Sequence, residues 1–136
     1  MIPWHELVLR LLLAVGLAAA LGAEREIRGK AAGLRTHVLI GVGSAGFTLA
    51  SFMGFTQADA ARVASGVVAG VGFLGAGVIF RGGRGNTDGS ISGLTTAASI
   101  WVTACVGLAA ASGLVVLAVA ITLVALVVLE LPKLRD

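Results

Sequence analysis

Apolar residues in this chain gather into five long runs, and short polar or glycine-rich stretches separate them. The runs cover residues 4–23, 37–55, 61–80, 94–111 and 114–131. Each is close to the ~20 residues that a helix needs to cross the hydrocarbon core of a bilayer. Because backbone groups in lipid must be hydrogen bonded within the protein, the runs predict helices and not strands. We therefore expect an all-α membrane protein, a single transmembrane domain over residues 1–136 with about five transmembrane helices.

The composition supports a membrane environment. Hydrophobic residues make up 57% of the chain and charged residues 12%, and 20 glycines come in addition. An ordinary soluble domain is about 45–50% apolar with glycine included and about 25% charged, so a soluble fold of this length could not bury so much apolar surface. We expect residues 4–23 to be a retained helix and not a cleaved signal peptide, because Glu6 and Arg10 interrupt the run and no basic stretch precedes it.

The basic residues lie at the ends of the apolar runs, where they predict orientation rather than a nucleic-acid partner. They are Arg25, Arg28, Lys30 and Arg35 in the first connection, Arg81 and Arg84 in the third, and Lys133 and Arg135 in the tail. Lys and Arg favour the cytoplasmic side of a membrane. The pattern predicts that the C-terminus is inside and the N-terminus outside, which agrees with five crossings.

The stretch "GVGFLG" at residues 70–75 spells the dinucleotide-binding fingerprint G-x-G-x-x-G. That fingerprint should open a helix after a short strand, but here it lies inside an uncharged membrane run, so we expect no nucleotide cofactor. Helical spacing places the small residues on adjoining stripes, and small stripes let membrane helices approach closely. We expect residues 61–80 to be the central helix and 114–131 a peripheral one. The predicted helix-packing residues are Gly66, Gly70, Gly72 and Gly77.

Two pairs of charges lie toward the predicted outer side. Glu6 and Arg10 have the i, i+4 spacing at which side chains on a helix meet, and intramembrane charges are functional candidates. Arg10 either extends to the membrane surface with Glu6 as its counter-ion or has a functional role. Asp59 either caps the third helix or joins Arg62, Glu6 and Arg10 in one cluster. Two acids beside two bases leave little net field for a cation, so we expect no metal site.

Other polar residues within the runs have ordinary structural explanations. Thr95, Ser99 and Thr103 form a hydroxyl stripe that either lines a polar path or, more often for such groups, bonds to helix backbones. His37 is expected at the membrane interface, and Cys105 is expected to be a small core residue. The chain shows no Ser/His/Asp set, no paired zinc ligands and no isolated acid pair. We therefore expect no catalytic residues, no cofactor and no enzyme.

Three blocks of the sequence resemble the signature blocks of the MgtC/SapB family in order and spacing. They are "GAEREIRGKAAGLRTH" (residues 22–37), "DAARVASGVVAGVGFLGAGVI" (residues 59–79) and "GLTTAASIW" (residues 93–101). The resemblance implies a multi-pass protein of the bacterial inner membrane, associated with magnesium limitation and, in pathogens, with survival inside macrophages. For the name-giving member it implies regulation of membrane partners, including the F-type ATP synthase, more than magnesium transport.

The family pattern can be carried over to individual positions. It falls on Arg10, Glu24, Arg25, Glu26, Lys30, Gly33, Arg35, Thr36, His37, Asp59, Arg62, Gly70, Gly72, Phe73, Gly75, Gly77, Gly93, Thr95 and Thr96. With Glu6, the polar members of this set are our functional candidates. This chain has Gly66 where the family often has a glutamine, and Ser92 where it often has a base. The lost amide weakens the argument for a polar translocation path.

Three hypotheses follow from these features. The first is a non-enzymatic membrane protein that acts through contacts with itself, as a homo-oligomer, and with other membrane proteins. The second is a small transporter or channel for magnesium or another cation, which a polar cavity joining Asp59 to Thr95 would favour. The third, weaker idea is that bases of the first connection, residues 24–36, bind anionic lipid head groups.

Overall fold

The computed structural model describes residues 1–83 and 92–133, and these residues form five helices and no strands. In chain order the helices are α1 (Trp4–Ile27), α2 (Leu34–Gly54), α3 (Gln57–Gly83), α4 (Leu94–Ala111) and α5 (Val115–Glu130). The first four are long and apolar enough to cross a membrane, and α5 is a shorter apolar helix. This confirms the predicted all-α class and is consistent with a helical membrane bundle.

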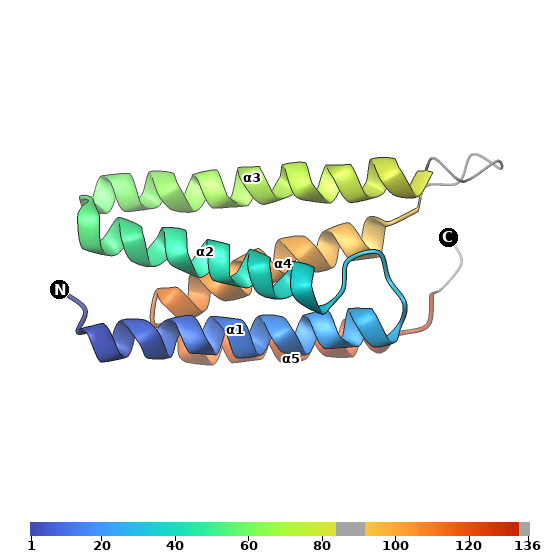
Figure 1. Cartoon of the computed structure of the whole chain (residues 1–136), viewed down its shortest axis with the longest axis horizontal. Coiled ribbons are helices and arrows are strands. Elements are labelled where there is room, and N and C mark those ends of the chain that lie inside the picture. Colours follow the sequence, from blue (N-terminus) through green and yellow to red (C-terminus); the bar gives the residue numbers. More distant parts are fainter. Residues whose placement is uncertain (84–91, 134–136) are drawn as a thin grey trace.

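Successive helices run in opposite directions, so α1 begins and α5 ends at opposite ends of the bundle (Figure 1). We call these the N-terminal end, which also holds the α2–α3 and α4–α5 turns, and the C-terminal end, which holds the α1–α2 loop and the start of α4. Arg84 and Arg135, which contribute to the predicted orientation, lie outside the described residues.

The turns at the helix ends explain where several helices stop. Helix α1 continues through its polar end to Ile27, because the amides of Arg28 and Lys30 still donate to the carbonyls of Glu24 and Arg25. Gly29 then takes a positive φ of 65°, which glycine adopts without the steric cost of a Cβ. Gly113 does the same between α4 and α5, with a φ of 80°.

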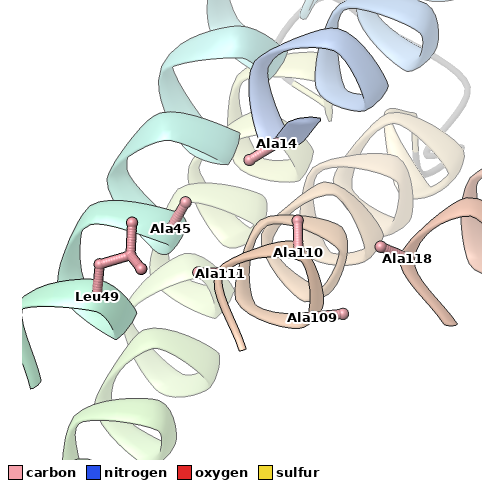
Figure 2. Close-up of a cluster of buried hydrophobic side chains, with 7 residues drawn as sticks. All are labelled: Ala14, Ala45, Leu49, Ala109, Ala110, Ala111 and Ala118. Carbon is pink, nitrogen blue, oxygen red and sulfur yellow. The ribbon is translucent and has the colours of Figure 1, made fainter. Parts of the chain in front are cut away.

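Small side chains form the core, as Figure 2 shows. Its buried cluster is Ala14, Ala45, Leu49, Ala109, Ala110, Ala111 and Ala118. Without a hydrophobic driving force between helices in lipid, close packing of small residues is what holds a membrane bundle together. Six alanines among these seven residues let α1, α2, α4 and α5 approach one another closely.

Helix α4 is the central element, and this corrects the expectation for α3. Of the 18 residues of α4, 56% are buried, against 11% of the most apolar 18-residue window of α3. Helix α3 packs on α2 and α4 alone among the other helices, and α5 buries only Ala118 and Thr122, as expected for a peripheral helix. Cys105 is exposed on α4, so its predicted place in the core is also wrong.

The glycines that bring helices together are not the predicted ones. No atom outside the local helix lies within 4 Å of a Cβ placed at any of the four predicted packing residues, which are Gly66, Gly70, Gly72 and Gly77. A Cβ at Gly107 would instead lie 2.6 Å from the Gly41 carbonyl oxygen, and one at Gly41 would lie 2.6 Å from the Ala18 Cβ. The close contacts inside the chain therefore join α1, α2 and α4. Any packing role of the four α3 glycines requires a surface other than the helices among the described residues.

Candidate functional site

The polar residues at the C-terminal end centre on His37, which is completely buried. Its Nδ1 lies 2.9 Å from the Gly33 carbonyl oxygen, and its Nε2 lies 3.0 Å from the Ser99 hydroxyl of α4. The Ser99 hydroxyl also lies 2.7 Å from the carbonyl oxygen of Thr96. Thr96 is itself a buried residue. The His37 ring thus links the start of α2 to α4, and its depth relative to the membrane interface stays a prediction.

The partners of the His37 ring determine which of its nitrogens donates and which accepts. The Gly33 carbonyl can only accept, so Nδ1 of a neutral His37 carries the proton and Nε2 accepts. The single Ser99 hydroxyl proton is then shared between Nε2 and the Thr96 carbonyl. Both ring nitrogens have partners, which removes the free-energy penalty for burying an unsatisfied polar group.

The next group joins the ends of α1 and α5. Arg25, with 2% exposure, donates from Nε and Nη2 to the two carboxylate oxygens of Glu24 at 2.5 and 2.9 Å. The Nε atom of Arg28 lies 3.7 Å from Oε1 of Glu24, and the Arg28 guanidinium also pairs with the carboxylate of Glu130 at the end of α5. This Arg28–Glu130 pair holds residues 102 positions apart in the chain.

Four other candidates at this end are exposed. They are Glu26, Lys30, Arg35 and Thr36. The Glu26 side chain lies over Gly33, because a Cβ at that glycine would be 3.1 Å from its carboxylate. Lys30 and Arg35 form no ion pair with any residue in 1–83 or 92–133. In the predicted basic loop, Arg25 and Arg28 therefore have carboxylate partners, whereas Lys30 and Arg35 have none among the described residues.

At the N-terminal end, Arg10 has a packing role. It donates to the Glu6 carboxylate, with Nη2 at 2.5 Å, and its Nη1 donates to the carbonyl oxygen of Ala111 at 2.9 Å. That carbonyl belongs to the last residue of α4, where helix carbonyls lack partners within the helix. A cation is also favourable at the negative end of a helix dipole. The sequence predicted the Glu6–Arg10 pair but not the contact with α4.

Thr56, the residue before α3, occupies the capping position, and Asp59 pairs with it from the first turn, so the predicted cap by Asp59 is wrong. The Thr56 hydroxyl donates to the Asp59 carboxylate at 2.9 Å, and the Asp59 amide is 3.4 Å from the Thr56 oxygen. Arg62 is exposed. Helices α1 and α3 do not touch, so the predicted cluster of Asp59 and Arg62 with the α1 pair does not form.

The hydroxyl stripe of α4 does not line a path. Ser99 and Thr103 are buried, and the Thr103 hydroxyl donates to the Ser99 carbonyl of its own helix at 2.7 Å. Thr95 is exposed and lines an apolar groove between α4 and α5 of about 410 Å³. Ser44 and Thr48 of α2 likewise donate to backbone carbonyls, at 2.6 and 2.8 Å.

The described residues contain no cluster of three His, Cys, Asp or Glu side chains suited to a metal ion. Every buried side-chain nitrogen and oxygen in that part of the chain has a hydrogen-bond partner. The larger hollow, a groove of about 500 Å³ between α2 and α3, is lined almost wholly by apolar groups. The buried polar side chains of the described residues therefore have their hydrogen-bond partners within the bundle.

Comparison with known proteins identifies the family of the chain. The model of the MgtC family matches residues 11–134, which is nearly the whole chain. This chain belongs to the MgtC family. The match confirms the resemblance carried by the three sequence blocks, and the MgtC fold is here a multi-pass helical bundle. No solved structure matches the chain.

Several curated proteins are similar to this MgtC-family chain. A protein of Escherichia coli named "Putative magnesium transporter YhiD" is 47% identical over 133 residues, covering 92% of this chain and 60% of that protein. Protein MgtC of Salmonella typhimurium is 42% identical over 120 residues, covering 88% and 49%. Protein MgtC of Brucella abortus is 41% identical over 99 residues, covering 73% and 40%. The chain thus spans 40–60% of the length of these relatives.

Proposed function

We propose that this chain serves magnesium homeostasis as a non-enzymatic protein of the bacterial inner membrane, acting through contacts with itself and with other membrane proteins. Its family and the names of its relatives support the link to magnesium, to virulence-type adaptation and to the membrane. The F-type ATP synthase is one candidate partner, through the family resemblance. The distribution of basic residues supports an orientation with the N-terminus outside and the C-terminus inside.

The observation that carries this proposal is the way polar groups are used inside the bundle. Ser44, Thr48, Thr103 and Thr122 are buried, and each hydroxyl donates to a backbone carbonyl. A cation crossing the membrane needs a sequence of oxygen ligands that face a shared space. Here both grooves have mainly apolar walls, and the helix that carries Asp59 does not bring that carboxylate to Thr95.

The second candidate is a cation transporter. It is favoured by the word transporter in the name of the Escherichia coli relative and by the charged groups at both ends of the bundle. In that case the polar path would form in another conformation or between copies, with Asp59 at its outer mouth.

Cation flux separates the two candidates. The purified chain is reconstituted in proteoliposomes that contain a magnesium-sensitive dye, beside empty vesicles and the Asp59→Asn variant. We expect influx equal to that of empty vesicles, with helical content verified by circular dichroism. Influx above that of empty vesicles that falls in Asp59→Asn would overturn the contact-based proposal.

A photo-crosslinking amino acid tests contact directly. It is placed at Phe73, which is 80% exposed on α3, and as a matched control at Ile100, which is 1% exposed on α4. In native membranes we expect adducts at twice the chain mass from position 73 and none from position 100. Absence of any adduct from position 73 would argue against the self-association part of the proposal.

A further inference from the structure

The larger groove is long and apolar, and it lies on the side of the bundle between α2 and α3. Side chains such as Leu39 and Phe47 of α2 and Leu74 of α3 form its walls, and Ile100 of α4 contributes to its lining. Gly43 also lines it and leaves room, because a Cβ there would meet nothing within 4 Å. We call this space the α2–α3 groove.

The dimensions of the α2–α3 groove decide what can fill it. Its lining on α2 extends from Thr36 to Phe47, which is about 17 Å at 1.5 Å per residue. A volume of about 500 Å³ over that length gives a cross-section of roughly 30 Å². A methylene chain, with carbon contacts at about 3.5–4.0 Å, is narrower than this cross-section. The groove is therefore long and wide enough for one acyl chain.

Unpaired positive charge lies at one end of this groove. Thr36 lines it at the C-terminal end of the bundle and follows Arg35, while Arg81 lies one helical turn beyond the lining residue Val78. Both arginines are exposed, and neither pairs with an acid in the described ranges. Among the exposed bases without a carboxylate partner in the described ranges, Arg35 and Arg81 are the two beside the groove end at Thr36 and Val78.

We propose that an anionic phospholipid binds here, with one acyl chain in the α2–α3 groove and its phosphate between Arg35 and Arg81. Basic pockets between transmembrane helices bind anionic head groups, because the phosphate is attracted to each base. In a zwitterionic lipid, the positive group of the head partly cancels this attraction. The proposal moves the predicted lipid contact away from Arg25 and Arg28, whose charges Glu24 and Glu130 already compensate. It does not depend on the proposed function.

Native mass spectrometry of the delipidated full chain tests the head-group contact. Phosphatidylglycerol and phosphatidylcholine with identical acyl chains are added in separate titrations. We expect tighter binding of phosphatidylglycerol, and a fall in its affinity of about fivefold for each base removed in Arg35→Gln and Arg81→Gln. The matched control is Lys30→Gln with Lys133→Gln, which removes two exposed bases that lie outside α2 and α3. Equal affinity of the unaltered chain for both lipids would overturn the proposal.

A second pair of variants tests the acyl-chain contact. Gly43→Leu places a side chain in the groove, and Gly16→Leu places the same side chain on α1, also where nothing lies within 4 Å. We expect Gly43→Leu to lower retention of phosphatidylglycerol at least tenfold, with helical content unchanged, and Gly16→Leu to leave retention as it is. If Gly43→Leu instead abolishes a dimer and leaves lipid retention intact, the groove holds a second copy of the chain and the lipid proposal is wrong.

Discussion

At the scale of single residues, His37 shows how a polar side chain can stabilise a membrane bundle. Its ring is buried between α2 and α4, with Gly33 and Ser99 as partners. At a position exposed to water, the same hydrogen bonds would stabilise the fold little, because water would compete for both ring nitrogens. Inside the bundle no water replaces a lost partner, so each hydrogen bond counts for more.

The residue-scale prediction concerns the Ser99 hydroxyl. In Ser99→Ala the Nε2 atom of His37 loses its partner while it stays buried, which should lower the free energy of unfolding by about 1–3 kcal/mol. The control is Thr122→Val, which removes a hydroxyl whose bond goes to the Ala118 carbonyl of its own helix and should change stability by less than about 1 kcal/mol. Both are measured by unfolding in mixed micelles with increasing dodecyl sulfate. Equal stability of the two variants would refute the role of the His37–Ser99 contact.

The sequence predicted single residues unevenly. It identified the Glu6–Arg10 pair, because the two residues are four positions apart on one helix. It assigned the cap of α3 to Asp59, three residues after Thr56, which holds that position. It missed the Arg10 contact with Ala111 and the Arg28 contact with Glu130, whose partners are about one hundred positions away. Such contacts depend on which helices become neighbours, and no local spacing encodes that.

At the scale of helices, the close approach of α4 to α2 organises the bundle. Glycine at position 107 lets the two backbones meet, and a Cβ there would be 2.6 Å from the Gly41 oxygen and 3.1 Å from the Ser44 Cβ. Backbone atoms cannot move aside as a flexible side chain does. The predicted packing glycines of α3 have no such partner among the described residues, and the prediction of α3 as the central helix, made from its stripes of small residues, is therefore wrong.

The element-scale prediction compares two glycines. Gly107→Ala forces α4 away from α2 and should cost about 1–3 kcal/mol, as other overpacked sites do. Gly16→Ala on α1 adds the same methyl group where nothing lies within 4 Å, and should be neutral or stabilising by up to about 1 kcal/mol. Thermal denaturation in detergent, followed by circular dichroism, gives both values. A Gly107→Ala protein as stable as the Gly16→Ala protein would show that the two helices are not in close contact.

At the scale of the whole molecule, five antiparallel helices place the start of α1 and the end of α5 at opposite ends of the bundle (Figure 1). The bases Arg25, Arg28, Lys30, Arg35 and Arg81 all lie at the C-terminal end. Such an asymmetry favours the cytoplasm for that end. It would also place the proposed lipid site in the inner leaflet.

The whole-molecule prediction concerns orientation. In a Cys105→Ala background, a single cysteine is introduced by Gly54→Cys at the N-terminal end or by Lys30→Cys at the C-terminal end. A membrane-impermeant maleimide should label position 54 in intact spheroplasts and position 30 only after permeabilisation. The reverse pattern would refute the orientation, and labelling of both positions from outside would contradict a membrane crossing by α2.

The sequence by itself determined the helical class, the approximate extent of the five helices and the family, because each depends on local hydropathy or on residues in ordered blocks. Only the tertiary structure decided that α4 is central, that Gly41 and Gly107 bring helices together, and that His37 is buried. The physical reason is that all five helices are apolar around most of their surface. Hydropathy therefore cannot distinguish a face that meets another helix from a face that meets lipid, and only shape complementarity between particular helices makes that choice.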